Sequence, residues 1–396
     1  LLPGAAVWMA AIVVAAEGLR SRVPYGGFPW GRIAFTQADG AYLPLAALGG
    51  AVLVTFAVAL TGCALAYVLL HIGQAPRRRV GLLVVGVSPL LVGWAMAPTI
   101  GVEPEAGTAE VAAVQGNAPD IGIDLMSENE TVRANHIAQA ERLVEDVRAG
   151  RVPRPDLVIL PESSNTFSAA RVDHDLDRIA TQLGAPLVVG GIAYDAQDRV
   201  SNRIIQWEPG RGATEEYAKQ QLVAFSEFIP LRELAGAVTP FVRQFGADMV
   251  PGDTPGVFDA GPVRLGVAIC YEVAYDYILN EATLAGAQLL AVPTNNAWFG
   301  RGEMTYQQLA MSRLRAVEHG RAVVVVSTSG VSAIVQPDGT VTRSTSLYTA
   351  DTLVERVPLR STITAATRLG SIPEWVLTAL AVLAVAASLR RTAMPN

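Results

Sequence analysis

The sequence predicts an α/β domain inserted between membrane-spanning helices, and three observations support this. Hydrophobic residues make up 51% of the 396 residues and charged residues only 17%, which is too apolar for an ordinary soluble enzyme of this size. The apolar excess lies at the two ends of the chain. The stretch between them alternates short β-branched runs with helical stretches, as α/β proteins do.

Four apolar segments approach or reach the length needed to cross a bilayer. They are residues 5–16, 43–72, 80–97 and 375–389. The first is short for a span, the third contains Pro89, and the last opens with Trp375, a residue type typical of membrane interfaces. We expect transmembrane helices over 1–98, a linker over 99–107, a catalytic domain over 108–361, a C-terminal transmembrane helix over 373–391 and a cytoplasmic tail over 392–396.

Arginines beside the predicted spans indicate the orientation of the chain. The runs 77–79 and 390–391 are both basic, and the positive-inside rule places both in the cytoplasm. The domain over 108–361 must then face away from the cytoplasm. Three further arginines, at positions 20, 22 and 32, lie in a loop predicted to be outside and are a weaker signal in the opposite direction.

Two further features of the composition limit the partners and the redox state. The net charge of −6 argues against binding to nucleic acid. The chain has two cysteines, and Cys63 lies within a predicted span, where it cannot easily meet Cys270. We therefore expect Cys270 to be a free thiol.

Within the domain, apolar runs predict strands and the segments between them predict helices. Ser127 and Glu130 form a capping-box pattern that begins the first helix, and Gly150 is a plausible end for it. The later helices are expected at about 275–285 and 305–318. The expected strands are 109–117, 156–162, 186–194, 263–270, 287–294 and 321–330.

Chemically capable side chains stand where predicted strands end, and strand ends face the crevice of an open sheet. "LPES" places Glu162 after one strand, and "VAICYE" places Cys270 after another. Lys219 and Glu227 lie in "EEYAKQQLVAFSEFIP", which reads as a loop. A carboxylate can take the proton of a thiol, and a lysine can stabilise the thiolate and an oxyanion. Together these residue types suffice for acyl transfer.

Taken one at a time, these residues have ordinary structural explanations. A lone cysteine at the end of an apolar strand is more often a small buried hydrophobe than a nucleophile. Glu162 could lie next to a helix cap, and Lys219 could be a solvated loop charge. The four histidines are scattered without metal-ligand spacing, so we expect no metal, and no phosphate-binding glycine motif is present.

Four motifs taken as a set resemble the nitrilase superfamily, the carbon–nitrogen hydrolases. They are "LPES", "YAKQQLVAFSEFIPLR", "GVAICYE" and "PTNNAWFG". The resemblance implies a nitrilase-like αββα sandwich with a Glu, Lys, Cys triad in that chain order. With apolar segments on both sides of the domain, the chain is similar to the apolipoprotein N-acyltransferase branch. "VQGN", "RLRAVEHGR" and "EGLRSRVPYGGFPWG" look like that branch, and by that comparison the chain lacks its first membrane helices.

The resemblance implies a role for each candidate residue. Cys270 would be the nucleophile, Glu162 the general base and Lys219 the stabiliser of the oxyanion and thiolate. Glu227 would be a second essential carboxylate, and Tyr271 and Glu272 would support the site. Asn296, Trp298 and Phe299 would be possible substrate contacts.

The same resemblance implies the reaction and the partners. A phospholipid would donate an acyl chain, through a thioester on Cys270, to the α-amine of an S-diacylglyceryl-cysteine at the start of an apolipoprotein. We expect no cofactor, a monomer, and a location in the bacterial plasma membrane. Apolar loop segments at 222–225 and 297–299 could enter the membrane interface or could be ordinary core packing.

Two rival functions remain open from the sequence. A membrane-anchored amidase or nitrilase would share the triad and the first half-reaction, but water would release its acyl group. A non-catalytic membrane scaffold would have no need for the full set of triad residues together with Glu227.

Overall fold

The computed structural model describes residues 4–70, 76–119, 128–168, 172–240, 242 and 246–393. The chain divides into two compact units. We call the first the helical unit, and it comprises Leu1–Gly101, Val317–Gly320 and Ile363–Asn396. We call the second the sandwich unit, and it comprises Val102–Ala316 and Arg321–Thr362.

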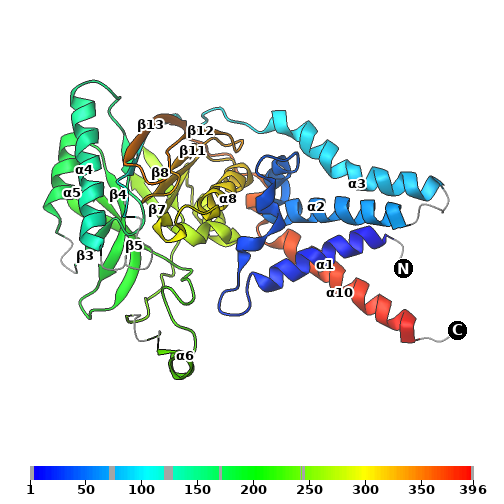
Figure 1. The fold of residues 1–396 in the computed structure, drawn as a ribbon. Helices are drawn as coiled ribbons and strands as arrows, with labels where there is room; N and C mark the ends of the chain where they lie inside the picture. Colours follow the sequence, from blue (N-terminus) through cyan, green and yellow to red (C-terminus); the bar gives the residue numbers. More distant parts are fainter. Residues whose placement is uncertain are drawn as a thin grey trace. The chain divides into compact units, whose positions relative to one another are not determined.

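The helical unit contains long apolar helices, shown in blue, cyan and red in Figure 1. Its α-helices are α1 (Ala5–Arg20), α2 (Ala46–Leu70), α3 (Pro76–Met96), α9 (Ala365–Leu369) and α10 (Ile372–Ala393). Short 3-10 helices occupy Pro29–Gly31, Ile33–Gln37, Leu43–Leu45 and Ala97–Thr99. Small side chains allow α1 and α2 to approach closely, since Ala6 and Ala10 pack with Leu60 and Ala64.

Three helical segments in the described part of the chain are long and apolar enough to cross a membrane. They are Leu43–Leu70, Arg79–Thr99 and Ile372–Arg390, with mean hydropathies of 2.3, 2.1 and 1.9. The chain is therefore a membrane protein. The helix α1 has 16 residues, fewer than the about 20 that a span needs, and is not among the three. A span at 5–16 stays a prediction.

The sandwich unit is built on two sheets that each contain parallel central strands. The first sheet has the order β13-β1-β2-β4-β5-β6, with β3 beside β4. Its strands are β1 (Thr108–Gln115), β2 (Leu157–Ile159), β3 (Asn165–Phe167), β4 (Leu187–Tyr194), β5 (Val200–Glu208), β6 (Gly212–Ala218) and β13 (Asp351–Pro358). The strands β1, β2 and β4 run parallel.

The second sheet has the order β12-β11-β10-β9-β8-β7. Its strands are β7 (Val257–Ala260), β8 (Val263–Val267), β9 (Leu289–Thr294), β10 (Val323–Ser327), β11 (Ala333–Val335) and β12 (Val341–Ser344). The strands β8, β9 and β10 are parallel, so their carboxyl ends lie at one edge.

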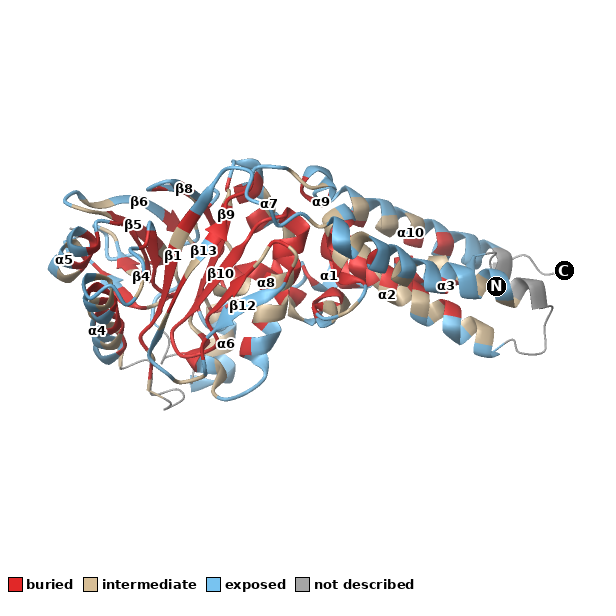
Figure 2. Ribbon diagram, turned by 90° about the horizontal axis from the view of Figure 1, so that it is seen from above, coloured by how far each residue is buried: buried red, intermediate tan, exposed pale blue. Residues whose placement is uncertain are grey.

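Both faces of the central strands are buried, which explains why they read as continuous apolar runs. In β1, Val111 joins the core between the two sheets, while Ala112 faces the opposite way into a cluster with the helices. The helices on that outer face of the first sheet are α4 (Asn129–Arg148) and α5 (His174–Leu183). Figure 2 shows the central strands largely buried.

Helices also accompany the second sheet, which completes the predicted αββα sandwich. They are α7 (Asp276–Leu284) and α8 (Met304–His319). On β8, a Cβ at Gly266 would meet the Cβ of Ala282 on α7 at 3.1 Å, so this glycine permits close packing of helix on sheet. The predicted αββα sandwich with flanking apolar helices is confirmed.

Several elements differ from the sequence-based expectation. The prediction of a loop around Lys219 is partly wrong, because β6 extends to Ala218 and pairs with β5. The strands β3, β5–β7 and β11–β13 and the helices α5, α6 (Arg232–Val238) and α9 were not expected. The predicted cap at Ser127 lies outside the described residues.

Candidate active site

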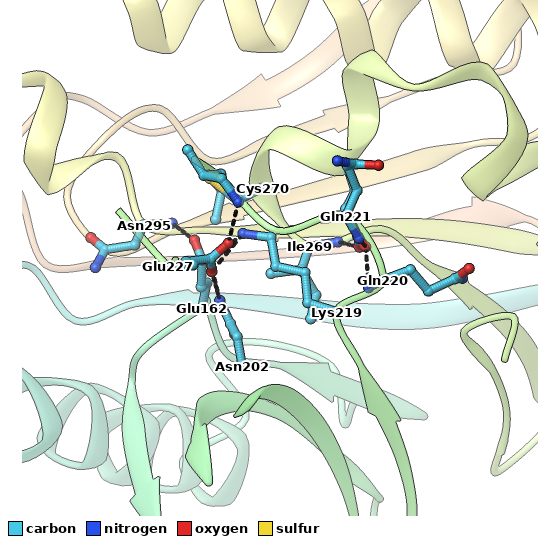
Figure 3. Close-up of polar contacts among 12 residues, drawn as sticks. Glu162, Asn202, Lys219, Gln220, Gln221, Glu227, Ile269, Cys270 and Asn295 are labelled. Atoms are coloured by element: carbon cyan, nitrogen blue, oxygen red, sulfur yellow. Dashed lines mark hydrogen bonds and ion pairs between the residues drawn. The ribbon is translucent and has the colours of Figure 1, made fainter. Parts of the chain in front are cut away.

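The ends of strands bring the predicted triad residues into one cluster (Figure 3). Glu162 lies three residues after β2, and Cys270 lies three residues after β8. Lys219 comes directly after β6. Because β2 belongs to one sheet and β8 to the other, the cluster lies where the two sheets meet at one edge of the sandwich.

Glu162 is buried, and three hydrogen bonds hold its carboxylate. Oε2 accepts the backbone N–H of Asn295 at 2.7 Å. Oε1 accepts the side-chain amide of Asn202 at 2.7 Å and the Lys219 ammonium at 3.3 Å. On β4, Gly190 leaves the room this requires, since a Cβ there would lie 2.7 Å from the Cα of Glu162.

Lys219 is a fully buried cation between two carboxylates. Its Nζ lies 3.0 Å from Oε1 of Glu227 and 3.3 Å from Oε1 of Glu162. Burial by itself would lower the pKa of Lys219, but the two carboxylates outweigh it and hold the pKa well above its usual value. Lys219 therefore stays protonated and can serve as a fixed positive charge.

Glu227 is held by the same partners and by its own loop. The amide of Asn202 donates to Oε1 at 2.8 Å, and the backbone N–H of Val223 donates to Oε2 at 2.8 Å. One asparagine thus bridges Glu162 and Glu227. Both carboxylates are fixed in place although they carry the same charge.

Cys270 opens a tight turn directly beside this cluster. Its φ of 53° lies in the left-handed region, an unusual conformation for a residue with a side chain. It begins a short 3-10 helix, Cys270–Ala274. Burial and the negative charge of Glu162 raise the pKa of the Cys270 thiol to about 12, and Lys219 opposes them. The resting group is therefore a thiol, next to a carboxylate that can take its proton.

Glu272 is fully buried and links the loop of Lys219 to the turn of Cys270. Its Oε1 accepts the backbone N–H groups of Gln220 and Gln221 at 2.7 and 3.0 Å. Its Oε2 accepts the N–H of Ile269 at 2.8 Å, and the hydroxyl of Tyr217 lies 2.9 Å from both oxygens. Burial raises the pKa of Glu272 to about 7, although Lys219 and the backbone donors act in the opposite direction.

Comparisons with known protein families agree with this geometry. The carbon–nitrogen hydrolase family model matches residues 110–367, and the model of the apolipoprotein N-acyltransferase N-terminal domain matches residues 1–64. An apolipoprotein N-acyltransferase of Mycolicibacterium smegmatis is 37% identical over 95% of this chain and 67% of its own length. The chain belongs to the apolipoprotein N-acyltransferase family.

This family assignment confirms the predicted enzyme class, an acyltransferase of the nitrilase fold with membrane helices. A second relative, the apolipoprotein N-acyltransferase of Azotobacter vinelandii, is 32% identical over 85% of this chain and 64% of its own length. The chain spans about two thirds of the length of these relatives. Among solved structures, Saccharomyces cerevisiae Nit3 of the nitrilase superfamily aligns with a TM-score of 0.46 and 18% identity, covering 64% of this chain and 90% of Nit3.

The supporting residues proposed from the N-acyltransferase resemblance lie in different environments. Tyr271 stacks edge-on against Tyr275, with ring centroids 5.4 Å apart. Asn296 is buried. Its amide oxygen accepts a hydrogen bond from the hydroxyl of Thr294, and its amide N–H donates to the hydroxyl of Thr305. Trp298 is 48% exposed, so it is available to a substrate, whereas the amide of Asn296 is already engaged.

The two apolar loop segments combine core and surface positions. Leu222 and Ala297 are buried, whereas Phe225 is 60% exposed and Phe299 is partly exposed. Each segment thus anchors one end in the protein and presents an aromatic ring outside it. Among the described residues, no group of three or more His, Cys, Asp or Glu side chains could hold a metal ion.

Sequence reasoning missed the neutral residues that orient the charged ones. Asn202 lies near the start of β5, a strand that was not expected, and Tyr217 lies in β6. Gln308 on α8 donates to the sulfur of Cys270 at an N–S distance of 3.7 Å. Amides and hydroxyls are common throughout the chain, and only their place in the fold distinguishes these three.

Proposed function

We propose that this chain transfers an acyl group from a phospholipid to the α-amine of the S-diacylglyceryl-cysteine that begins an apolipoprotein. The reaction passes through a thioester on Cys270. One observation carries the proposal: the buried side chains of Glu162 and Lys219 meet the partly exposed Cys270 in one cluster, in a chain with three membrane-length helices. Membership of the N-acyltransferase family supports the same reaction.

In the first half-reaction the thiol of Cys270 attacks the ester of the phospholipid. Glu162 takes the thiol proton as the Sγ–C bond forms, because the high pKa of the thiol leaves little free thiolate beforehand. The charge that develops on the carbonyl oxygen is stabilised by the Lys219 ammonium. The ester C–O bond then breaks, Glu162 returns its proton to the leaving oxygen, and a lysophospholipid departs.

In the second half-reaction the amine of the apolipoprotein attacks the thioester carbonyl. Glu162 accepts a proton from the amine, the C–S bond breaks, and the electron pair returns to the sulfur of Cys270. The thiol is then restored by the proton on Glu162. Both substrates carry lipid chains, so a membrane concentrates them near the site and favours the amine over water.

Residues that hold the charged groups support this mechanism. We assign Glu227 to keeping Lys219 charged and in place, at a distance of 3.0 Å. Glu272 positions the loop of Lys219 and the turn of Cys270 relative to each other. Tyr271 belongs to that turn, and Trp298 and Phe299 are candidate contacts for acyl chains.

We further propose that the domain over 108–361 is the catalytic part and works on the extracytoplasmic face of the bacterial plasma membrane. The arginine runs at 77–79 and 390–391 support this orientation by the positive-inside rule. The cluster already contains a nucleophile, a base and a cation, so we propose that the reaction needs no cofactor. We propose that the enzyme acts as a monomer.

Intact-mass spectrometry tests the proposal. The purified chain and a Cys270→Ala variant are incubated with phospholipid vesicles, and an added fatty-acyl mass is expected on the wild type alone. A diacylglyceryl-cysteine peptide should discharge this adduct rapidly and water slowly. If no adduct forms and the protein instead hydrolyses a small amide, the acyltransferase proposal fails and an amidase takes its place.

A further inference from the structure

One face of α8 is directed at the turn that carries Cys270. Gln308 is 1% exposed, and its Nε2 donates to the sulfur of Cys270 at 3.7 Å. Two turns further along the helix, Arg315 donates to the backbone carbonyls of Val273 and Ala274 at 2.8 and 3.0 Å. Residues seven apart lie on the same side of a helix, so α8 positions Gln308 and the nucleophile's turn together.

The amide of Gln308 is also held from its other end. The hydroxyl of Thr294, at the end of β9, lies 3.0 Å from Oε1 of Gln308 and 2.8 Å from Oδ1 of Asn296, so the two amide oxygens share its one hydrogen. This contact leaves Nε2 directed at the sulfur of Cys270. An amide N–H stabilises a thiolate, whereas the reverse orientation would put a carbonyl oxygen against it.

The charged cluster beside Cys270 creates a need for such a donor. Lys219 supplies one positive charge, but Glu162 and Glu227 supply two negative charges within 3.3 Å of it. Burial disfavours a thiolate at Cys270 most, and the negative charge of Glu162 adds to this effect, so the pKa of the thiol is raised although Lys219 opposes both. The neutral amide N–H of Gln308 on α8 offsets part of this cost of forming the thiolate, and it adds no further titrating group.

We propose that Gln308 is a further catalytic residue, whose amide N–H stabilises the sulfur of Cys270 as a thiolate in both half-reactions. In the first, it favours the nucleophile as Glu162 removes the thiol proton. In the second, it stabilises the electron pair that returns to sulfur when the C–S bond breaks, and so improves the leaving group. This inference rests on the proposed role of Cys270 as the nucleophile.

The experiment measures the rate at which Cys270 is alkylated in the full, detergent-solubilised chain. Peptide mass spectrometry distinguishes Cys270 from Cys63. The variants are Gln308→Leu, which removes the donor at similar volume, and Gln308→Glu, which keeps the shape and adds a negative charge. Gln307→Leu, at the exposed neighbouring position, is the matched control. Iodoacetamide and the larger N-ethylmaleimide are compared from pH 7 to 9.

Loss of thiolate should slow both reagents equally. We expect alkylation to be about tenfold slower in Gln308→Leu, which corresponds to about one pKa unit, and at least as slow in Gln308→Glu. Gln307→Leu should match the wild type. A rate within twofold of the wild type in both Gln308 variants overturns the proposal, and so does unequal slowing of the two reagents, because that indicates altered access. If Gln308→Leu does not fold, the alkylation rate of Gln308→Glu alone decides whether the proposal stands.

The alkylation assay needs neither phospholipid nor acceptor, so the two proposals can fail separately. A missing acyl adduct on the wild type refutes the acyltransferase function and leaves the alkylation result standing. An adduct that forms and discharges equally fast in the wild type and Gln308→Leu refutes the role of Gln308 alone.

Discussion

Replacing Glu272 by glutamine is the most direct way to perturb the arrangement of the site without touching its triad. The carboxylate accepts three backbone N–H groups, from Gln220, Gln221 and Ile269. A glutamine has one oxygen and one NH₂ group. Its NH₂ must therefore face at least one of these buried donors, which then loses its acceptor.

The expected cost follows from the number of lost bonds. One buried N–H without a partner costs about 1–3 kcal/mol of stability. If the NH₂ takes the place of Oε2, the N–H of Ile269 is affected, directly before Cys270. A displacement of the nucleophile by about 1 Å can cost about 100-fold in rate. We expect acyl-enzyme formation in Glu272→Gln to fall by about that factor.

The pH dependence of stability gives an independent check with a definite sign. The pKa of Glu272 is about 7 in the folded protein against an ordinary value of 4.5. Between these values the folded chain binds more protons than the unfolded chain, so this group's contribution to stability is lost as pH rises towards 7. Between pH 5.5 and 8, the titration of Glu272 should lower the free energy of unfolding of the wild type by about 2 kcal/mol. Glu272→Gln should lack this decrease.

The assay combines denaturant unfolding of the solubilised chain at pH 5.5 and 8 with the acyl-mass measurement. Glu281→Gln, an exposed glutamate on α7, is the matched control and should change neither quantity. Tyr217→Phe removes one hydroxyl donor and should cost about 1 kcal/mol. A folded Glu272→Gln protein that acylates at the wild-type rate would refute the positioning role of this carboxylate.

Three other changes have expected outcomes of the same kind. Lys219→Met leaves two buried carboxylates without their cation, so the free energy of unfolding should fall by about 3–5 kcal/mol. The same change should abolish acyl-enzyme formation in the mass assay. Gly190→Ala places a Cβ 2.4 Å from the carbonyl oxygen of Pro161, so we expect about 1–3 kcal/mol of destabilisation by thermal or denaturant unfolding, and slower acylation as Glu162 shifts. Arg315→Lys keeps the charge but not the two-carbonyl contact, and should slow acylation about tenfold in single-turnover measurements.

Each of these changes has a control within the chain. Adding Glu227→Gln to Lys219→Met should restore part of the stability and none of the activity. Gly236→Ala adds a Cβ that meets no described atom within 4 Å outside the backbone of its own helix, so it should not lower stability and should leave acylation unchanged. Arg321 is likewise buried and donates to backbone carbonyls, those of Ala287 and Thr362, away from Cys270. Equal slowing of acylation in Arg321→Lys and Arg315→Lys would count against a specific role for Arg315.

Local sequence determined the parts of this protein that depend on local properties. Apolar stretches of sufficient length predicted the three membrane-length helices, because length and hydropathy alone decide whether a helix can cross a bilayer. Continuous apolar runs predicted the central strands such as β1 and β9, which are buried on both faces. Glu162 and Cys270 could be singled out because a polar residue directly after such a run stands at a strand end.

Tertiary structure alone decided how these residues act together. Edge strands such as β6 and β12 carry mixed or exposed residues, and they are strands because of the neighbours with which they pair. Asn202, Tyr217 and Gln308 are ordinary polar residues in the sequence, and each matters through contacts with residues distant in the chain. The left-handed backbone of Cys270 is likewise held by contacts from Glu272 and Arg315. Such contacts depend on which elements pack together, and that is a property of the whole fold.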